Sequence, residues 1–334
     1  MFRRIHRISS AIIAALAYGL LMGAVQSRML HFQPPRPFDT TDCKGLSMYG
    51  RLEKKFEPSD MVWQPSTNTL FVVSDGGKIG GLTNIGTPDG SGTPAEIWDL
   101  GGDFDLEGCT LVAGRDDFIY LGNEVPASIV EYNLKTSSVT RRWDLQATFD
   151  AHPVADPDAK ADNNGLESLV FMSSPDVKSG GYFYAGRQAD AQIFVYDIPL
   201  DDPSGSATLM GIIDPPGQGY DLSAMTLWRN NLWLLYDKPK ELRAVEWSNA
   251  MLSPTARPVQ KVNAKGLQNT RVGTLSFSVR GQEAIQFVQD PQGKQWVFVG
   301  VDPPKRKGPK DLLRFELEEF FDCFADAGTA AIPP

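Results

Sequence analysis

The sequence predicts an all-β protein, a five-bladed β-propeller, on three observations. The chain of 334 residues is 42% hydrophobic with 31 glycines and 24 prolines, and its short apolar runs suit many strands joined by turns. A five-residue phrase occurs five times at spacings of 47 to 60 residues, which leaves room for a four-stranded blade of about 40 to 50 residues. Each phrase is followed by an apolar run that ends in a polar cluster. The phrases begin at Ser59, Leu106, Leu166, Leu222 and Gln282.

Each phrase is expected to form the innermost strand of its blade, with further strands outside it. In the third repeat the predicted strands are 166–171, 182–185, 192–197 and 208–213. In the fourth repeat they are 223–228, 232–236, 242–247 and 259–262, and in the second repeat the outer strands are 118–122, 129–133 and 139–145. Residues 44–56 are available to pair near 312–317 and so complete the last blade. A six-bladed propeller, with an extra blade between 252 and 280, is the alternative.

The first 30 residues differ in character from the rest of the chain. They carry four arginines and no acidic residue, and residues 8–27 are uncharged, which is long enough for a single N-terminal hydrophobic helix to span a bilayer. This segment is interpreted as a membrane anchor or, alternatively, a signal peptide, and either one places the body outside the cytoplasm. The predicted parts are 1–30 as anchor or signal peptide, 31–43 as a proline-rich linker, 44–322 as the propeller and 323–334 as a tail.

Four of the five phrases carry a carboxylate at the second position. All inner strands of a propeller begin on one face around the axis, so Asp60, Glu107, Glu167 and Glu283 are expected to converge there, with Ser223 completing the ring. The polar clusters that follow the second strands return to the same face. They supply the candidate ligand-binding residues Asp75, Glu124, Arg187, Asp237, Lys238 and Asp302.

This acidic ring predicts a calcium site. Converging carboxylates cannot all stay ionised unless a proton or a cation relieves them. Ca²⁺ takes about six to eight oxygen ligands, which carboxylates, carbonyls and water supply, whereas the absence of cysteine and histidine from the ring argues against softer metals. His152 is the only histidine beyond residue 31, so a zinc site built from several histidines is excluded.

The three cysteines have different predicted roles. Cys109 stands at the fourth position of its phrase, where the other repeats have apolar residues, and is expected to fill the core. Cys43 and Cys323 flank the repeats, so they could form a disulfide if the chain ends meet, as an exported protein permits.

Several motifs resemble the SdiA-regulated family of bacterial periplasmic β-propellers. The similar segments follow the order of the family within residues 59–317, and they are 105–108, 120–124, 164–167, 221–223 and 282–284. The resemblance implies a five-bladed propeller, distantly related to NHL-repeat and phytase-like propellers, with a bound calcium ion. It also implies a periplasmic location, with the leader either tethering the body to the inner membrane or cleaved on export. No reaction is established for the family as a class.

The function favoured by the sequence is a calcium-binding module at the membrane that docks a ligand or a protein. A metal-dependent phosphoesterase is one alternative, with Arg187 or Lys238 holding the phosphate, and an accessory subunit of a membrane protein complex is another. Nucleic acid is excluded as a partner, because residues 31–334 carry 41 acidic against 28 basic side chains.

Overall fold

The structure is a computed structural model in which the chain divides into two units, Met1–Pro37 and Phe38–Pro334. It describes part of the second unit, namely residues 45–101, 103–154, 165–175, 177–214, 221–229, 231–238, 240–246, 260–263, 269–274, 281–302 and 310–324. The predicted N-terminal helix and the proline-rich linker lie outside these residues. Within them, no helix has both the length and the apolar character needed to cross a membrane.

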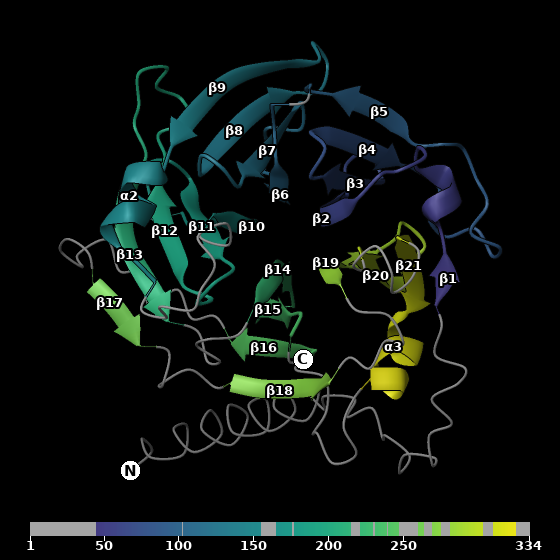
Figure 1. The fold of residues 1–334 in the computed structure, drawn as a ribbon. Coiled ribbons are helices and arrows are strands. Elements are labelled where there is room, and N and C mark those ends of the chain that lie inside the picture. The colour runs from purple at the N-terminus through teal and green to yellow at the C-terminus, as the bar shows by residue number, and fades with distance from the viewer. Residues whose placement is uncertain are drawn as a thin grey trace, which may run out of the picture. The chain divides into compact units, whose positions relative to one another are not determined.

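The described part of the second unit is a five-bladed β-propeller, as the sequence predicts (Figure 1). The innermost strands adjoin one another in the order β2, β6, β10, β14 and β19, and β19 adjoins β2 again, which closes the ring. Few helices accompany the strands. Within the residues that the structure describes, they are the 3-10 helix η1 (Tyr49–Arg51), α2 (Gln146–Ala151) and α3 (Leu317–Phe324).

The blades follow one another along the chain. Blade 1 contains β2 (Pro58–Gln64), β3 (Thr69–Ser74), β4 (Lys78–Leu82) and β5 (Glu96–Asp99). Blade 2 contains β6 (Leu106–Thr110), β7 (Phe118–Asn123), β8 (Ser128–Asn133) and β9 (Ser138–Asp144). Blade 3 contains β10 (Leu166–Ser173), β11 (Gly181–Arg187), β12 (Ile193–Asp197), β13 (Thr208–Asp214) and β17 (Gln260–Asn263). Blade 4 contains β14 (Leu222–Trp228), β15 (Asn231–Tyr236), β16 (Glu241–Glu246) and β18 (Asn269–Thr274). Blade 5 contains β19 (Gln282–Gln289), β20 (Gln295–Val301), β21 (Asp311–Glu316) and β1 (Leu46–Ser47).

The N-terminal strand β1 closes the propeller by completing blade 5. Leu46 lies opposite Arg314 and Ser47 opposite Leu313 in an antiparallel pair, which confirms the predicted pairing of the two ends of the repeat region. The Ser47 hydroxyl donates a hydrogen bond of 2.6 Å to the carboxylate of Asp311. Gly45, just before the strand, has a φ of +61°, and a side chain there would collide with the ring of Phe315.

The prediction for residues 259–262 is wrong. These residues were assigned to the fourth repeat, but β17 pairs in parallel with β13 and so extends blade 3, while β18 is the outer strand of blade 4. An outer strand has a neighbour on one side only, and β17 contains a single apolar residue, Val262. Its sequence therefore carries little information about which sheet it joins.

The core lies between neighbouring blades, with one buried cluster at each of the five interfaces. Alternation along a strand produces this arrangement, because successive side chains point to opposite faces of the sheet. In β3, Leu70 and Val72 pack toward blade 5, whereas Phe71 and Val73 pack toward blade 2. Cys109 is buried in the second of these clusters, as predicted for a residue that fills the core.

Candidate functional site

Every inner strand of the propeller contains a β-bulge at the same place. In each case the pairing with the second strand skips one residue, so that the strand carries an extra, unpaired position at the start of the blade. A bulge turns its extra side chain away from the regular alternation, and such positions often lie beside functional sites. The skipped residues are Ser59, Glu107, Glu167, Ser223 and Glu283.

The ring of equivalent positions therefore differs from the predicted one in blade 1. The register places Ser59, not Asp60, in line with Glu107, and Met61, not Val62, in line with Cys109. A one-residue slip in a strand exchanges the faces to which side chains point, so Asp60 acquires a different role from the three glutamates.

Asp60 is a structural residue buried among the inner strands of the propeller. It is fully buried, and its carboxylate accepts hydrogen bonds from the backbone amides of Met61 at 2.8 Å and of Cys109 at 2.7 Å. A further bond from the amide of Leu169 means that one side chain links the inner strands of blades 1, 2 and 3. Burial raises the pKa of Asp60 well above its usual range, and these bonds oppose that shift.

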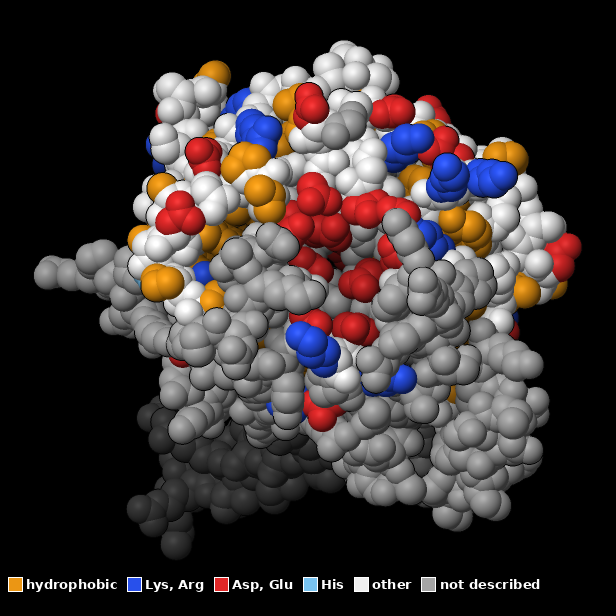
Figure 2. Space-filling model, viewed as in Figure 1, with side chains coloured by type: hydrophobic (Ala, Val, Ile, Leu, Met, Phe, Trp, Pro, Cys, Tyr) orange, Lys and Arg blue, Asp and Glu red, His pale blue; other side chains and the backbone are white. Residues whose placement is uncertain are grey.

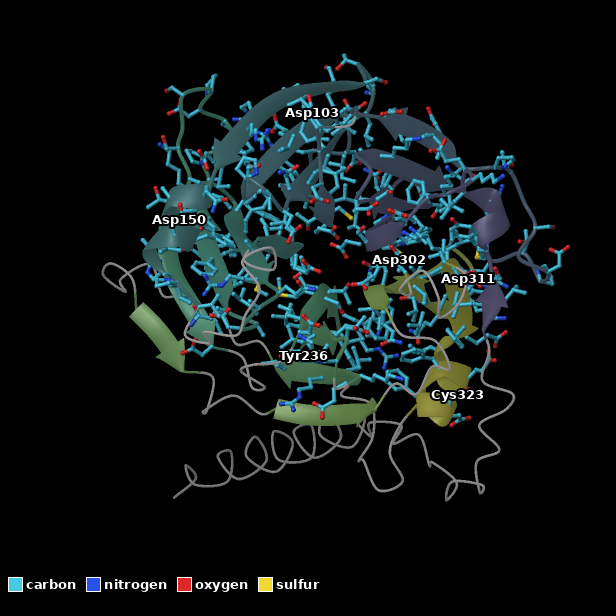
Figure 3. All side chains as sticks on the ribbon, in the orientation of Figure 1. Asp103, Asp150, Tyr236, Asp302, Asp311 and Cys323 are labelled. Atoms are coloured by element: carbon cyan, nitrogen blue, oxygen red, sulfur yellow. The ribbon has the colours of Figure 1, made fainter. Side chains whose placement is uncertain are left out.

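A second tier of polar residues follows the second strands. The strand ends are equivalent, so the next residue in each blade occupies a matching position, and these residues are Asp75, Glu124, Gln188, Asp237 and Asp302. Four of the five are acids that the sequence predicts for this face. We call the face that carries the bulge residues and these strand-end residues the mouth. Acidic side chains gather around a central hollow on this face (Figure 2), and Asp302 lies near the centre of the ring (Figure 3).

Two groups of three carboxylates are close enough to share an ion. Glu57, Asp75 and Asp302 form one group, which we call the seam triad because it joins blades 1 and 5. Asp105, Glu107 and Glu124 form the other, which we call the blade 2 triad. In each triad one carboxylate oxygen from every residue lies within 4.8 Å of the others.

The three bulge glutamates share one electrostatic environment. Burial raises the pKa of Glu107 well above its usual range, and Asp105 and Glu283 raise it further. The pKa of Glu167 is also raised well above its usual range, first by burial and then by the charges of Glu107 and Glu283. Burial, followed by Asp237 and other mouth acids, raises the pKa of Glu283 to about 8. The structure thus brings Glu107, Glu167 and Glu283 together, as the sequence predicts, at a place where each resists ionisation.

Glu167 is the most deeply placed member of this group. Its side chain is 6% exposed, and no described residue donates a hydrogen bond to its carboxylate. Burial disfavours the charged form of a carboxyl group, so this position favours a protonated carboxyl or a carboxylate with a cation beside it.

Two lysines reach the mouth. The ammonium group of Lys238 lies 3.3 Å from Asp221, and its side chain is 75% exposed. Lys310 forms ion pairs with two members of the seam triad, Glu57 and Asp302, the latter at 3.3 Å. Among the described residues, none of the ion pairs involves Glu107, Glu167 or Glu283.

Arg187 is not directed into the mouth. It is 1% exposed, and its guanidinium donates to both carboxylate oxygens of Asp190, at 2.9 and 2.6 Å, and to the carbonyl of His152 at 2.6 Å. The same group lies over the rings of Phe149 and Phe194. Its donors are therefore engaged in holding α2 against blade 3 and are not available to an anionic ligand.

Asp237 has a bridging role at the mouth. One of its carboxylate oxygens accepts hydrogen bonds from the amides of Gly281, at 3.1 Å, and Gln282, at 3.3 Å, and so ties blade 4 to blade 5. Cys323, labelled in Figure 3, lies in α3 and is disulfide-bonded, whereas Cys109 is a free thiol. Cys43 lies outside the described residues, so its pairing with Cys323 stays a prediction.

Sequence reasoning missed four residues of the mouth, which are Glu57, Asp105, Asp221 and Lys310. A recurring pattern could have revealed the acids, because three of the five repeats carry an acid two residues before the bulge. Lys310 has no counterpart in the other repeats, and only the fold brings it to Glu57.

The donor set at the mouth fits a hard metal ion. All of the converging ligands are carboxylates, and neither cysteine nor histidine is among them. Oxygen ligands in an irregular arrangement suit Ca²⁺ better than Zn²⁺ or copper, which prefer nitrogen and sulfur. Asp105, Glu107 and Glu124, whose carboxylate oxygens lie within 4.8 Å of one another, could hold such an ion.

No protein-family model matches the sequence, and no curated protein matches it. Several solved structures are similar to part of this chain. Kuenenia stuttgartiensis hydrazine synthase is 12% identical with a TM-score of 0.40, over 79% of this chain and 64% of that one, slightly less than two thirds of its length. Myxococcus xanthus glutaminyl cyclase is 10% identical with a TM-score of 0.46, over 81% and 91% of the chains. The Cps50 (Swd1) β-propeller domain of Myceliophteria thermophila is 8% identical with a TM-score of 0.45, over 79% and 88%.

Proposed function

We propose that the protein is a calcium-binding β-propeller module whose mouth takes one Ca²⁺ beside Glu107 and Glu167 and thereby presents a binding surface to a ligand or protein. One observation carries the proposal. Glu107, Glu167 and Glu283 converge from three bulges without an ion pair to any described base, and Glu167 is buried without a hydrogen-bond donor among the described residues.

The charge balance explains why a divalent cation fits this place. Carboxylates held close together in a poorly solvated site repel one another, and either protons or a metal must offset that repulsion. A divalent ion replaces several protons at once and accepts the irregular oxygen set that the bulges present. The mouth would then change from a cluster of protonated acids to a rigid site as the ion binds.

The proposal also includes a location outside the cytoplasm. The uncharged stretch 8–27 of the leader supports export, and the disulfide at Cys323 is of a kind that forms in oxidising compartments. The resemblance to the SdiA-regulated periplasmic propellers agrees with both. A partner in a membrane complex stays a prediction from the leader. We do not extend the proposal to a phosphoesterase, because the guanidinium of Arg187 is buried and engaged by Asp190, and the ammonium group of Lys238 pairs with Asp221.

A calcium titration of the full-length protein tests the proposal. We expect Ca²⁺ to raise the melting temperature by several degrees and a chelator to reverse the effect, with Glu167→Gln as the variant that loses the response. An equal response of the variant would place the ion elsewhere. An unchanged melting temperature of the native protein across the titration would refute the metal site.

A further inference from the structure

Three arginines are buried among the described residues, and two of them have no carboxylate partner. Arg187 is paired with Asp190, whereas Arg51 and Arg314 form no ion pair within the described part of the chain. Arg51 is 6% exposed and Arg314 is 5% exposed. A guanidinium keeps its positive charge in a protein, and a buried charge without a counter-charge is costly. The fold therefore buries two positive charges that no described acid contacts.

Both arginines lie where the ring closes, on the face opposite the mouth. Arg51 ends η1, and Arg314 belongs to β21 of blade 5. Their guanidinium groups donate to backbone carbonyls of the loop 83–95, which joins β4 to β5. Because β4 begins beside Ser74 at the mouth and ends at Leu82, this loop lies at the far end of blade 1. A ligand bound there would not touch the acids of the mouth.

The loop satisfies only part of the donors that the two side chains offer. Arg51 uses all three of its nitrogens, and its acceptors are the carbonyls of Thr83, Asn84 and Thr93. Arg314 uses only Nη1, which donates to the carbonyl of Ile85. The Nε and Nη2 atoms of Arg314 have no partner among the described residues, and neither atom is fully enclosed. Solvent and small ions can therefore reach these two donors.

The acids whose charges act on Arg314 form no ion pair with it. These acids are Asp89, Glu316 and Glu319. Glu316 pairs with Lys294, and Asp89 accepts hydrogen bonds from the amide of Ser91 at 3.0 Å and from its hydroxyl at 2.6 Å. The nearest negative charges are thus engaged with other groups.

The orientation of Arg314 leaves its donor edge free. Its guanidinium lies over the indole ring of Trp296, 4.4 Å from the ring centroid. A stacked guanidinium uses its flat face for the ring and keeps the N–H edge for acceptors in its own plane, and two parallel N–H groups match two oxygens of one anion. Burial lowers the pKa of Arg314, and the charge of Glu316 opposes this shift while that of Arg51 adds to it. An anion placed here would therefore be attracted by both guanidinium groups.

We propose that Arg314 and Arg51 form a binding site for a small tetrahedral oxyanion such as phosphate, on the face opposite the mouth. Nε and Nη2 of Arg314 would donate to two oxygens of the anion, and Arg51 would contribute its charge from beneath the loop 83–95. The anion would supply the counter-charge that the described acids do not, and it would strengthen the seam between blades 1 and 5. This site is separate from the calcium module and does not depend on it.

Isothermal titration calorimetry of the full-length protein with inorganic phosphate, in the presence of a chelator, tests the site. We expect one saturable binding event in the native protein and none in Arg314→Gln. Arg314→Lys keeps the charge but loses one of the two parallel donors. Its dissociation constant should rise about tenfold, because one charge-assisted hydrogen bond is lost.

Arg142→Gln is the matched control. The guanidinium of Arg142 also lies over an aromatic ring, that of Phe104 at 5.8 Å, and donates to a neutral acceptor, the hydroxyl of Ser128 at 3.0 Å. It lies in β9, away from the loop 83–95. Its replacement should leave the affinity for phosphate unchanged.

The outcomes decide the proposal in either direction. Saturable binding by the native protein and by Arg142→Gln, with none by Arg314→Gln, supports the site. No saturable binding by the native protein, or equal affinity in the native protein and Arg314→Gln, overturns it. If circular dichroism shows that Arg314→Gln does not fold, Arg314→Lys decides, and an unchanged affinity in that variant overturns the paired contact. Because the chelator removes Ca²⁺ throughout, none of these results bears on the calcium module.

Discussion

The two triads at the mouth show how one propeller face can treat similar acids in different ways. The seam triad is neutralised from within, because Lys310 contacts Glu57 and Asp302. None of the described ion pairs involves Glu107 or Glu167, and burial and neighbouring acids raise the pKa of both carboxyl groups. Acids that gather on one face can therefore be neutralised by a lysine of the chain, as at the seam triad, or kept neutral by protons, which is the state that burial favours for Glu107 and Glu167.

The largest effect is expected from Glu107→Gln in the blade 2 triad. Replacing a charged ligand by a neutral one should weaken Ca²⁺ affinity about 10- to 100-fold, because ligand charge strongly tunes calcium sites. The same change relieves repulsion, so the metal-free variant should melt at a higher temperature. Calorimetry with Ca²⁺ and melting curves in chelator measure the two effects.

Glu57→Gln in the seam triad is the matched control for that change. It should leave Ca²⁺ affinity within about twofold and lower the melting temperature, since it removes a partner of Lys310. Equal losses of affinity in the two variants would remove the distinction between the triads.

Asp60→Asn should destabilise the protein without altering calcium binding. The carboxylate accepts three backbone amides, and the amide nitrogen of asparagine would face one of these donors. Leaving a buried donor without an acceptor costs about 1 to 3 kcal/mol. Chemical denaturation measures the loss, and a tenfold fall in Ca²⁺ affinity would show that Asp60 belongs to the ion site after all.

The metal-free protein should become less stable as the pH rises, whereas ion-paired acids usually make a protein more stable as the pH rises. Glu283 has a pKa raised to about 8 by burial first, so the folded protein holds a proton that the unfolded chain releases near 4.5. Stability from this group is present below pH 4.5 and is lost as the pH rises toward 8. Melting temperatures in chelator should therefore fall over this window, and Ca²⁺ should restore them most at the upper end. A rise over the window would contradict the account.

The smallest effect is expected from Lys238→Met. Its ion pair with Asp221 is mostly exposed, and exposed pairs contribute roughly 0 to 1 kcal/mol. The loss of one positive charge at the rim should strengthen Ca²⁺ binding by about twofold or less at physiological salt. A loss of binding in this variant would assign Lys238 a direct role in holding the ligand.

The fold and much of the mouth can be predicted from the sequence because both depend on a repeated local pattern. The phrase that marks each inner strand also contains its bulge, and so Glu107, Glu167 and Glu283 could be placed together before the strands were known. The prediction for the first repeat is wrong because Ser59 and Asp60 are adjacent polar residues. Only the pairing of β2 with β3 decides which of the two is the unpaired bulge residue.

The remaining differences depend on contacts between residues far apart in the chain. Lys310 belongs to no repeated motif, and its position next to Glu57 follows from closure of the ring. Likewise, Arg187 follows a polar pattern typical of the mouth, yet Asp190 and the carbonyl of His152 hold it in the blade. A strand pattern specifies alternation within a sheet and does not specify which side chains meet across blades.

An anomalous difference map from crystals of the full-length protein grown with Tb³⁺ in place of Ca²⁺ tests the central claim most directly. The account predicts one peak at the mouth, within ligand distance of Glu107 and Glu167, and none among Glu57, Asp75 and Asp302. The absence of a peak at the mouth, or a peak in the seam triad with the blade 2 triad empty, would contradict it.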